Sequence, residues 1–242
     1  MKVAVIGAAG HIGKALCRRL KNEMMEVDAF TKTSEQSEQM DEATEINPRN
    51  FFDVSDRVDM HNTVLDEYIR DKKMIDAVIY CVGHCLPGGF LDAIKHPMSQ
   101  YPIDDLDREL DMHIRGPFNV FQEFLPFVHD GGRFVFMSSA ATRLLAMPRE
   151  QRPPIHIYHH LAAIAAGDAL IEGMRMDPEL KKRGIMIDRI MPPAVSDSPF
   201  HQVEGGPKLP VTVTTAQVVD AIVSTLIAPC HQDVMMVLTP AK

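Results

Sequence analysis

The sequence begins with a short apolar run that leads directly into a glycine-rich loop. Residues 3–6 (Val-Ala-Val-Ile) have the composition of a buried strand, and Gly7, Gly10 and Gly13 follow at three-residue spacing. Residues 12–21 then show the apolar spacing of a helix. Glycines between a strand and a helix permit a tight turn and bring the backbone close to a pyrophosphate at the positive end of the helix. This arrangement predicts a dinucleotide-binding loop; a glycine turn with a purely structural role is the alternative.

Strand-like and helix-like segments alternate along the rest of the chain. The strand-like runs are residues 3–6, 27–31, 51–54, 77–82, 133–137, 185–190 and 234–238. The helix-like segments are residues 12–21, 58–70, 106–128, 158–176 and 216–226. This alternation is typical of a parallel sheet with helices on both faces. We predict an α/β fold, a doubly wound parallel sheet (Rossmann fold) of about seven strands, formed by residues 1–242 as a single domain.

Composition excludes several classes of partner. A net charge of -8 argues against an extended surface for nucleic acid or for an anionic membrane, although it leaves room for a local basic pocket. No run approaches the roughly eighteen apolar residues of a membrane-spanning helix. Four cysteines are too few for a disulfide framework. We expect a cytoplasmic protein that binds neither membrane nor nucleic acid.

Several later segments resemble motifs of the short-chain dehydrogenase/reductase family. The glycine loop is similar to that family's variant with three-residue spacing. Residues 52–56 (Phe-Asp-Val-Ser-Asp) resemble the segment that touches the adenine, and residues 80–83 (Tyr-Cys-Val-Gly) resemble the end of the fourth strand. Further matches are residues 106–116, 132–139, 183–185 and 191–195. These matches occur in the family's order over nearly the whole chain.

The resemblance implies a nicotinamide dinucleotide cofactor and a set of contacts to it. By position, Asp53 and Val54 would hold the adenine edge, and residues 191–195 would lie over the nicotinamide. The residues implied in cofactor binding are Gly7, Ala9, Gly10, His11, Ile12, Gly13, Thr31, Lys32, Asp53, Val54, Cys81, Val82, Gly83, Pro192 and Val195.

Two residues at the end of the second strand bear on which coenzyme is used. Thr31 stands where NAD-preferring family members carry an acid for the ribose 2′-hydroxyl, and Lys32 stands where NADP-preferring members often have a basic residue. A carboxylate would repel a 2′-phosphate, whereas a hydroxyl and an ammonium can bind it. We therefore expect NADP(H) in preference to NAD(H). The alternative is that Lys32 is only a solvated charge on a loop.

The resemblance also implies a catalytic serine and a catalytic tyrosine. Ser139 ends the predicted fifth strand, and Tyr158 begins the predicted active-site helix. We expect Tyr158 to exchange a proton with the substrate oxygen and Ser139 to polarise that oxygen. The family's lysine, four residues after the tyrosine on the same helical face, is Ala162 here. A literal Tyr-x-x-x-Lys at residues 68–72 precedes the fourth strand and cannot be the active-site helix.

Other positions of the catalytic region also depart from the family. His113 stands at the position of the family's helix asparagine, and Pro193 replaces a loop glycine. The nicotinamide-contacting threonine corresponds to Asp197, or to Ser198 if the loop slips by one residue. Residues 147–154 form an insertion between Ser139 and the active-site helix. These departures indicate an altered catalytic centre.

The missing lysine charge limits what the tyrosine can do. A tyrosine without a neighbouring cation keeps a pKa near about 10, so it can act as an acid but is a poor base at neutral pH. The candidate replacements for the charge are Arg143, Arg149, Arg152, His159 and His160. His156 and His160 have the i, i+4 spacing of metal ligands, but no acid or cysteine lies beside them at ligand spacing. We therefore expect no metal.

Taken together, these features predict an NADP(H)-dependent oxidoreductase that reduces a carbonyl of a small-molecule substrate. The alternative is a catalytically impaired nicotinamide-nucleotide-binding protein that acts as a sensor or an assembly subunit. Small residues on several faces of residues 158–176 permit close helix approach, and family relatives pair this helix between subunits. We expect a homodimer or homotetramer; packing within one monomer is the alternative.

Overall fold

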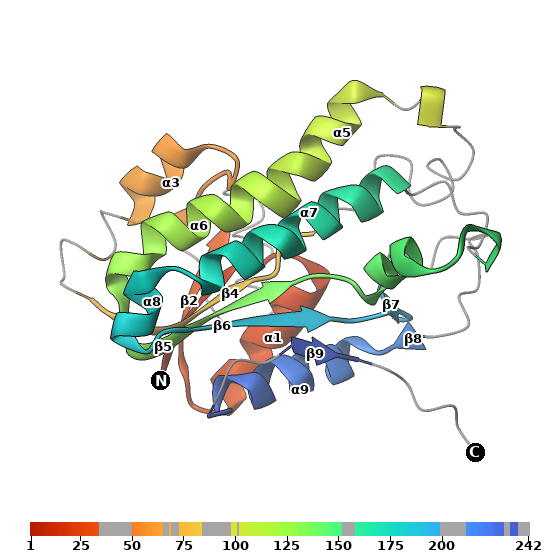
Figure 1. Cartoon of the computed structure of the whole chain (residues 1–242). Helices are drawn as coiled ribbons and strands as arrows, with labels where there is room; N and C mark the ends of the chain where they lie inside the picture. The colour runs from red at the N-terminus through yellow and green to blue at the C-terminus, as the bar shows by residue number, and fades with distance from the viewer. Residues whose placement is uncertain are drawn as a thin grey trace, which may run out of the picture.

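The computed structural model describes residues 1–33, 50–64, 68, 73–83, 98–100, 102–151, 158–198, 212–229 and 233–236. Seven strands form one sheet in the order β3-β2-β1-β4-β5-β6-β9, and every neighbouring pair is parallel. The strands are β1 (Lys2–Ile6), β2 (Glu26–Thr31), β3 (Asn50–Phe51), β4 (Ile75–Tyr80), β5 (Val128–Met137), β6 (Met186–Met191) and β9 (Asp233–Met235). The chain runs outward from β1 to β3 and then in the other direction from β4, so the sheet is doubly wound (Figure 1). The predicted fold class is confirmed.

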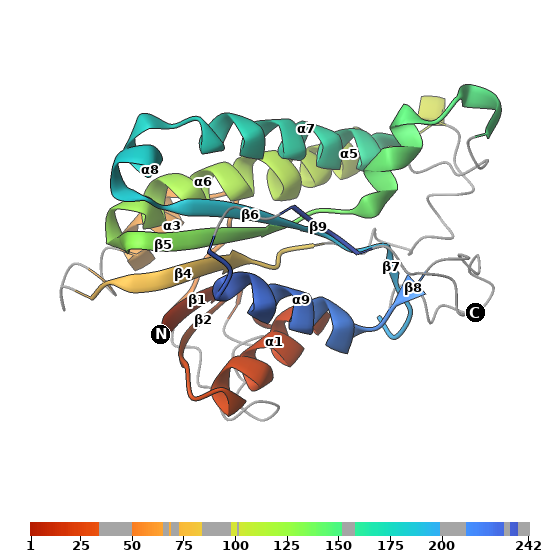
Figure 2. The ribbon, with the colours of Figure 1, turned by 60° about the horizontal axis from the view of Figure 1, so that its bottom comes forward.

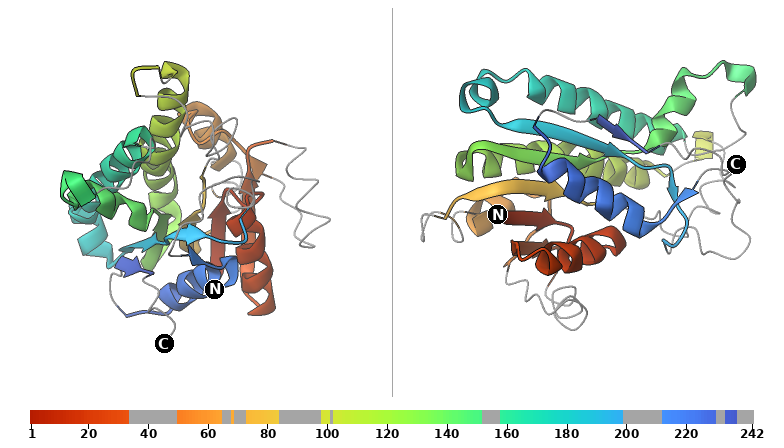
Figure 3. Two further views of the ribbon diagram at one scale, coloured as in Figure 1. Left: turned by 90° about the vertical axis from the view of Figure 1, so that its right-hand side faces the viewer. Right: turned by 90° about the horizontal axis from the view of Figure 1, so that it is seen from below.

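Helices cover both faces of the sheet (Figures 2 and 3). One face carries α1 (His11–Asn22) and α9 (Thr215–Leu226), which pack against each other. The other face carries α3 (Arg57–Val64), α5 (Ile103–Leu110), α6 (Gly116–Phe124), α7 (Tyr158–Arg175) and α8 (Pro178–Arg183). Two apolar cores result, one on each side of the sheet. Alternate residues of β1 enter opposite cores, with Val3 and Val5 on the α1 side and Ala4 and Ile6 on the other.

The predicted long helix over residues 106–128 is wrong in its details. The structure has α5, then a π-helical segment, η3 (Asp111–Arg115), then α6 and a 3₁₀ turn, η4 (Leu125–Phe127). Val128, predicted to end the helix, begins β5 instead. A buried tyrosine lies against the π segment. The buried Tyr80 hydroxyl donates to the carbonyl of Met112 at 2.7 Å, and a Cβ on Gly116 would lie 2.3 Å from that hydroxyl.

Other boundaries also differ from the sequence-based ones. The strand predicted over residues 51–54 is β3, which ends at Phe51, so Asp53 and Val54 lie in the turn after it. The strand predicted to reach Val82 ends at Tyr80. Helix α8 was not predicted; its N-cap, Asp177, accepts from the backbone N–H of Glu179 at 2.8 Å.

The carboxyl ends of the strands lie at one end of the molecule, together with several short elements (Figure 1). These are two 3₁₀ segments, η5 (Ala140–Ala146) and η6 (Arg149–Gln151), and a two-stranded pair, β7 (Ala194–Val195) and β8 (Thr212–Val213). A further 3₁₀ turn, η2 (Met98–Gln100), precedes α5. None of the described helices is long and apolar enough to cross a membrane. In doubly wound sheets, ligands bind at the carboxyl ends of the strands where the strand order reverses, here between β1 and β4.

Candidate cofactor and active site

The loop between β1 and α1 has the geometry that its glycines predict. Gly7 has φ +81°, and a Cβ there would lie 3.0 Å from the backbone nitrogen of Val82. A Cβ on Gly13 would lie 2.3 Å from the carbonyl oxygen of Gly7. Helix α1 begins at His11, and Lys14 is the first residue whose N–H bonds back to the loop, at the carbonyl of Gly10. The first turn of α1 thus presents amides without i−4 partners, as an anion site requires.

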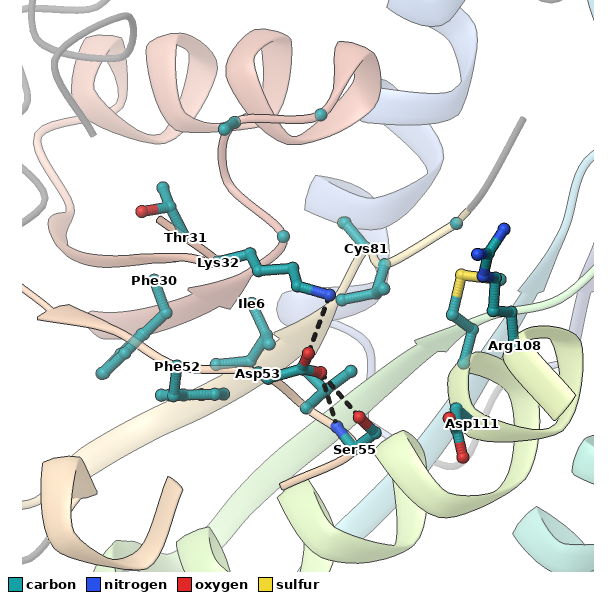
Figure 4. Close-up of a pocket in the computed structure, with 17 residues that line it drawn as sticks. Ile6, Phe30, Thr31, Lys32, Phe52, Asp53, Ser55, Cys81, Arg108 and Asp111 are labelled. Atoms are coloured by element: carbon teal, nitrogen blue, oxygen red, sulfur yellow. Dashed lines mark hydrogen bonds and ion pairs between the residues drawn. The ribbon is translucent and has the colours of Figure 1, made fainter. Parts of the chain in front are cut away.

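A cavity of about 510 Å³ opens beside this loop, at the reversal of strand order (Figure 4). Of the predicted cofactor-binding residues, it is lined by Gly7, Ala9, Gly10, Thr31, Lys32, Asp53, Val54, Cys81, Val82 and Gly83. These residues come from the carboxyl ends of β1, β2, β3 and β4, which are far apart in sequence. Its volume and concave form are those of a site for a small molecule or cofactor.

Lys32 and Asp53, which both line this cavity, form an ion pair (Figure 4). The Lys32 Nζ lies 2.7 Å from Asp53 Oδ2, and the Lys32 side chain is 63% exposed. Asp53 Oδ1 accepts hydrogen bonds from the backbone N–H of Ser55 at 3.0 Å and from its hydroxyl at 2.8 Å. Burial acts to raise the pKa of Asp53, but Lys32 and Ser55 outweigh it and lower the pKa. The turn after β3 therefore carries a fixed carboxylate with its own cation.

The opposite wall comes from residues that sequence reasoning did not select. Arg108, Asp111 and Met112 line the cavity from α5 and η3. Their i, i+3, i+4 spacing puts them on one helical face, just before the predicted asparagine position His113. This spacing is visible in the sequence and is the signal by which the three residues could be found. Ser55, in the turn after β3, also lines the cavity and is not among the predicted residues.

Five predicted cofactor-binding residues lie outside the cavity lining: His11, Ile12, Gly13, Pro192 and Val195. The His11 imidazole Nε2 lies 2.8 Å from the Thr215 hydroxyl, at the start of α9. That hydroxyl donates to Asp197 Oδ1 at 2.8 Å, and the same oxygen accepts from the Thr215 N–H. Asp197 is therefore anchored to α9. Val195 packs into the core on the α1 side.

Ser139 follows β5 and caps the start of η5. Its Oγ accepts from the backbone N–H of Ala141 at 3.2 Å, which fixes the oxygen while its own O–H can donate to a substrate. The next residue, Ala140, donates its N–H to the carbonyl of Pro192 at 2.9 Å. The structure therefore brings the predicted catalytic serine beside the predicted nicotinamide loop.

Helix α7 begins at Tyr158, at the same end of the molecule, and packs against η5 (Figure 1). Ala162 lies on the exposed face of α7. That face continues with Ala166, Ala169 and Gly173, so its small residues are accessible. The predicted pairing of subunits through this helix stays a prediction.

A buried carboxylate lies between two histidines where α7 meets α5 and η3. Glu109 has no exposed side-chain surface; its Oε2 lies 2.8 Å from His160 Nδ1 and 3.3 Å from His113 Nε2. Burial acts to raise the pKa of Glu109, but the contacts with the two imidazoles outweigh it and lower the pKa to about 2. No acid lies at ligand spacing from His160 in the sequence; the fold brings one beside it, Glu109, from 51 residues away. His160 is turned toward α5, so it does not stand in for a lysine at Ala162.

The fold is a doubly wound α/β domain with a cavity at the reversal of strand order. The family model for short chain dehydrogenase matches residues 1–205. The chain belongs to the short-chain dehydrogenase family.

Solved structures resemble the chain over nearly its whole length. A short-chain dehydrogenase/reductase from Serratia marcescens is 19% identical, with a TM-score of 0.70 over 96% of this chain and 95% of that chain. A short chain dehydrogenase from Burkholderia cenocepacia, in complex with NADP, is 18% identical, with a TM-score of 0.71 over 96% and 95%. A dehydrogenase/reductase from Sinorhizobium meliloti is 17% identical, with a TM-score of 0.73 over 96% and 92%. The comparison with curated proteins finds no match.

Proposed function

We propose that the chain is an NADP(H)-dependent oxidoreductase that reduces a carbonyl group of a small molecule. The observation that carries the proposal is the cavity beside the glycine loop, into which β1, β2, β3 and β4 bring their carboxyl ends. A Cβ on Gly7 would press on the backbone of Cys81 and Val82, and one on Gly13 would overlap the Gly7 carbonyl, so glycine at both positions permits the tight turn and the close helix packing that a diphosphate-binding loop needs. The NADP in the similar Burkholderia structure supports the same choice of coenzyme.

The chain's own residues have defined roles in this reaction. The reduced nicotinamide, when bound, supplies the hydride that the carbonyl carbon accepts. Tyr158 donates its phenolic proton to the carbonyl oxygen as that oxygen becomes an alkoxide, and the product is the alcohol. Ser139 donates a hydrogen bond to the same oxygen and polarises the carbonyl. With Ala162 in place of lysine, Tyr158 acts as a neutral acid, and this favours reduction over alcohol oxidation at neutral pH.

The second candidate function is coenzyme binding without turnover, as in a sensor or an assembly subunit. Ala162 favours this reading, because α7 supplies no cation at that position. Both functions require the glycine loop to bind the coenzyme. They differ only at the catalytic centre.

Calorimetry for coenzyme binding and an assay of NADPH oxidation, both on the same preparation of protein, distinguish the two functions. We expect NADPH to bind, and its oxidation to accelerate with at least one member of a broad panel of ketones and aldehydes. Ala9→Asp, which aims a carboxylate into the cavity, should abolish NADPH binding; Ala216→Asp, on the exposed side of α9, should leave binding unchanged. Binding without any turnover would favour the sensor. Absence of binding by both NADPH and NADH in folded protein would refute both functions.

Lys32→Ala tests the proposed coenzyme preference. We expect the Kd for NADPH to rise by about 3- to 10-fold, since a charge-assisted hydrogen bond is lost at an exposed site and Asp53 is left to repel the 2′-phosphate. The Kd for NADH, which lacks that phosphate, should change by less than about twofold. Lys182→Ala, which removes an exposed lysine of α8, is the matched control. Equal losses for both coenzymes would show that Lys32 does not read the 2′-phosphate.

A further inference from the structure

The cluster of Glu109, His113 and His160 takes no part in the proposed reaction. One ligand-type atom from each residue lies within 4.8 Å of the others. Glu109 and His113 are one helical turn apart, while His160 comes from α7. The two imidazole rings are nearly perpendicular, at 73°, with their centroids 5.3 Å apart. Two nitrogens and one carboxylate oxygen therefore converge on one point between two helices.

Hydrogen bonding within the cluster leaves two of its buried atoms unmatched. Glu109 Oε1 and His113 Nε2 are both buried, and neither has a hydrogen-bond partner among the described residues. The 3.3 Å approach of His113 Nε2 to Glu109 Oε2 is therefore close but not aligned for a hydrogen bond. Buried polar atoms without partners are rare and costly, so a missing group is the expected explanation.

The distances between the ligand atoms of the cluster fit a single metal ion bound by all three residues. Ligand atoms about 2.0–2.1 Å from a tetrahedral Zn²⁺ lie about 3.3 Å from one another. The His113–Glu109 separation is already 3.3 Å, and the His160–Glu109 separation of 2.8 Å requires a small opening. Two imidazoles and one carboxylate form a donor set that zinc uses with water as fourth ligand. His160 is partly exposed, with 27% of its side chain accessible, so water can reach the ion.

The backbone around the cluster is held in place before any ion binds. His113 lies within the π segment η3, and such segments occur often at functional sites. A Cβ on Gly167 would lie 2.2 Å from the His113 carbonyl oxygen, so only glycine permits this approach of α7. The ligands from the two helices are therefore fixed at short range.

We propose that Glu109, His113 and His160 bind one divalent transition-metal ion of the zinc class, which joins α5 and η3 to the start of α7. The ion holds the helix that begins at Tyr158 against the wall of the cavity. The proposal does not depend on the coenzyme, and its test does not require turnover.

The test is metal binding by chelator-treated full-length protein. Calorimetry with Zn²⁺ should give one ion per chain, and Co²⁺ should produce the visible absorption of a tetrahedral nitrogen and oxygen site. His160→Ala and Glu109→Gln should each weaken Zn²⁺ binding by more than tenfold and abolish the rise in Tm that the ion causes. The matched control is His61→Ala, which removes a histidine whose Nδ1 lies 2.5 Å from Glu123 Oε2 and which belongs to no three-ligand cluster among the described residues.

Three results would overturn the proposal. The first is folded wild-type protein that binds neither Zn²⁺ nor Co²⁺. The second is binding that His160→Ala leaves intact. The third is binding that His61→Ala weakens as much as His160→Ala does. If Glu109→Gln fails to fold, His160→Asn decides the matter, because it removes the ring nitrogen ligand from the partly exposed side of the cluster.

Discussion

Tyr158→Phe should lower the rate of carbonyl reduction by about 10²- to 10⁴-fold, which is the usual contribution of a positioned general acid. The phenyl ring keeps the shape of the side chain and removes only the hydroxyl. The Kd for NADPH should therefore change little, so that the loss appears in kcat. Steady-state kinetics with the best carbonyl substrate, together with calorimetry for NADPH, measure both quantities.

The control for this change is Tyr68→Phe. Tyr68 is buried, and its hydroxyl donates to Asp28 at 2.8 Å, on β2 and away from the catalytic loop. Its loss should cost about 1.5–3 kcal/mol of stability, because the acceptor is a carboxylate, and leave kcat within about twofold of the wild type. Turnover that survives Tyr158→Phe would show that another group delivers the proton. The assignment of Tyr158 would then be abandoned, although coenzyme binding would stand.

Arg133→Leu should lower the free energy of unfolding by about 3–5 kcal/mol, the cost of leaving a buried charge without its partner. Arg133 Nη1 lies 2.6 Å from Asp188 Oδ2, and these residues are only 3% and 0% exposed. The guanidinium also donates to the carbonyls of Thr225 and Ala228, at the end of α9. One side chain thereby ties β5 to β6 and to the last turn of α9.

Urea unfolding followed by circular dichroism measures the loss, with an unchanged m-value expected for an intact fold. Arg19→Leu breaks an exposed pair of the same chemistry, Arg19 with Asp220 on α9 at 2.6 Å. That change should cost less than about 1 kcal/mol. A loss of similar size in the two variants would contradict the role assigned to the buried pair.

The sequence predicts the sheet and the cavity at the carboxyl ends of its strands well, for a physical reason. The glycine loop and the strand ends are local features, and a parallel α/β topology brings the carboxyl ends of its strands together without further information. Thr31, Lys32 and Asp53 therefore meet in one cavity, as expected from their positions after β2 and β3. Whether they bind coenzyme stays a prediction.

What the sequence does not predict depends on contacts between distant segments. Within the π segment, the carbonyl of Met112 accepts from the Tyr80 hydroxyl, 32 residues away in sequence, and no local pattern encodes that bond. Glu109 meets His160 only because Gly167 lets α7 approach η3. A search limited to residues near His160 in sequence could not find the carboxylate. Residues 152–157 lie outside the described residues. They include the end of the insertion and two residues named in the sequence analysis, Arg152 and His156.

The ion pair between Lys32 and Asp53 has a consequence for how a coenzyme enters. A nucleotide with a 2′-phosphate would exchange one anion for another at the Lys32 ammonium, so the chain carries its own internal competitor for that cation. The preference for NADP(H) over NAD(H) then depends on how much more strongly the Lys32 ammonium attracts the 2′-phosphate than it attracts the Asp53 carboxylate. It does not depend on the full energy of one new contact. Added salt weakens the exposed lysine's attraction to either of them. For the proposed coenzyme, this competition reduces the free energy that the contact with Lys32 adds to binding.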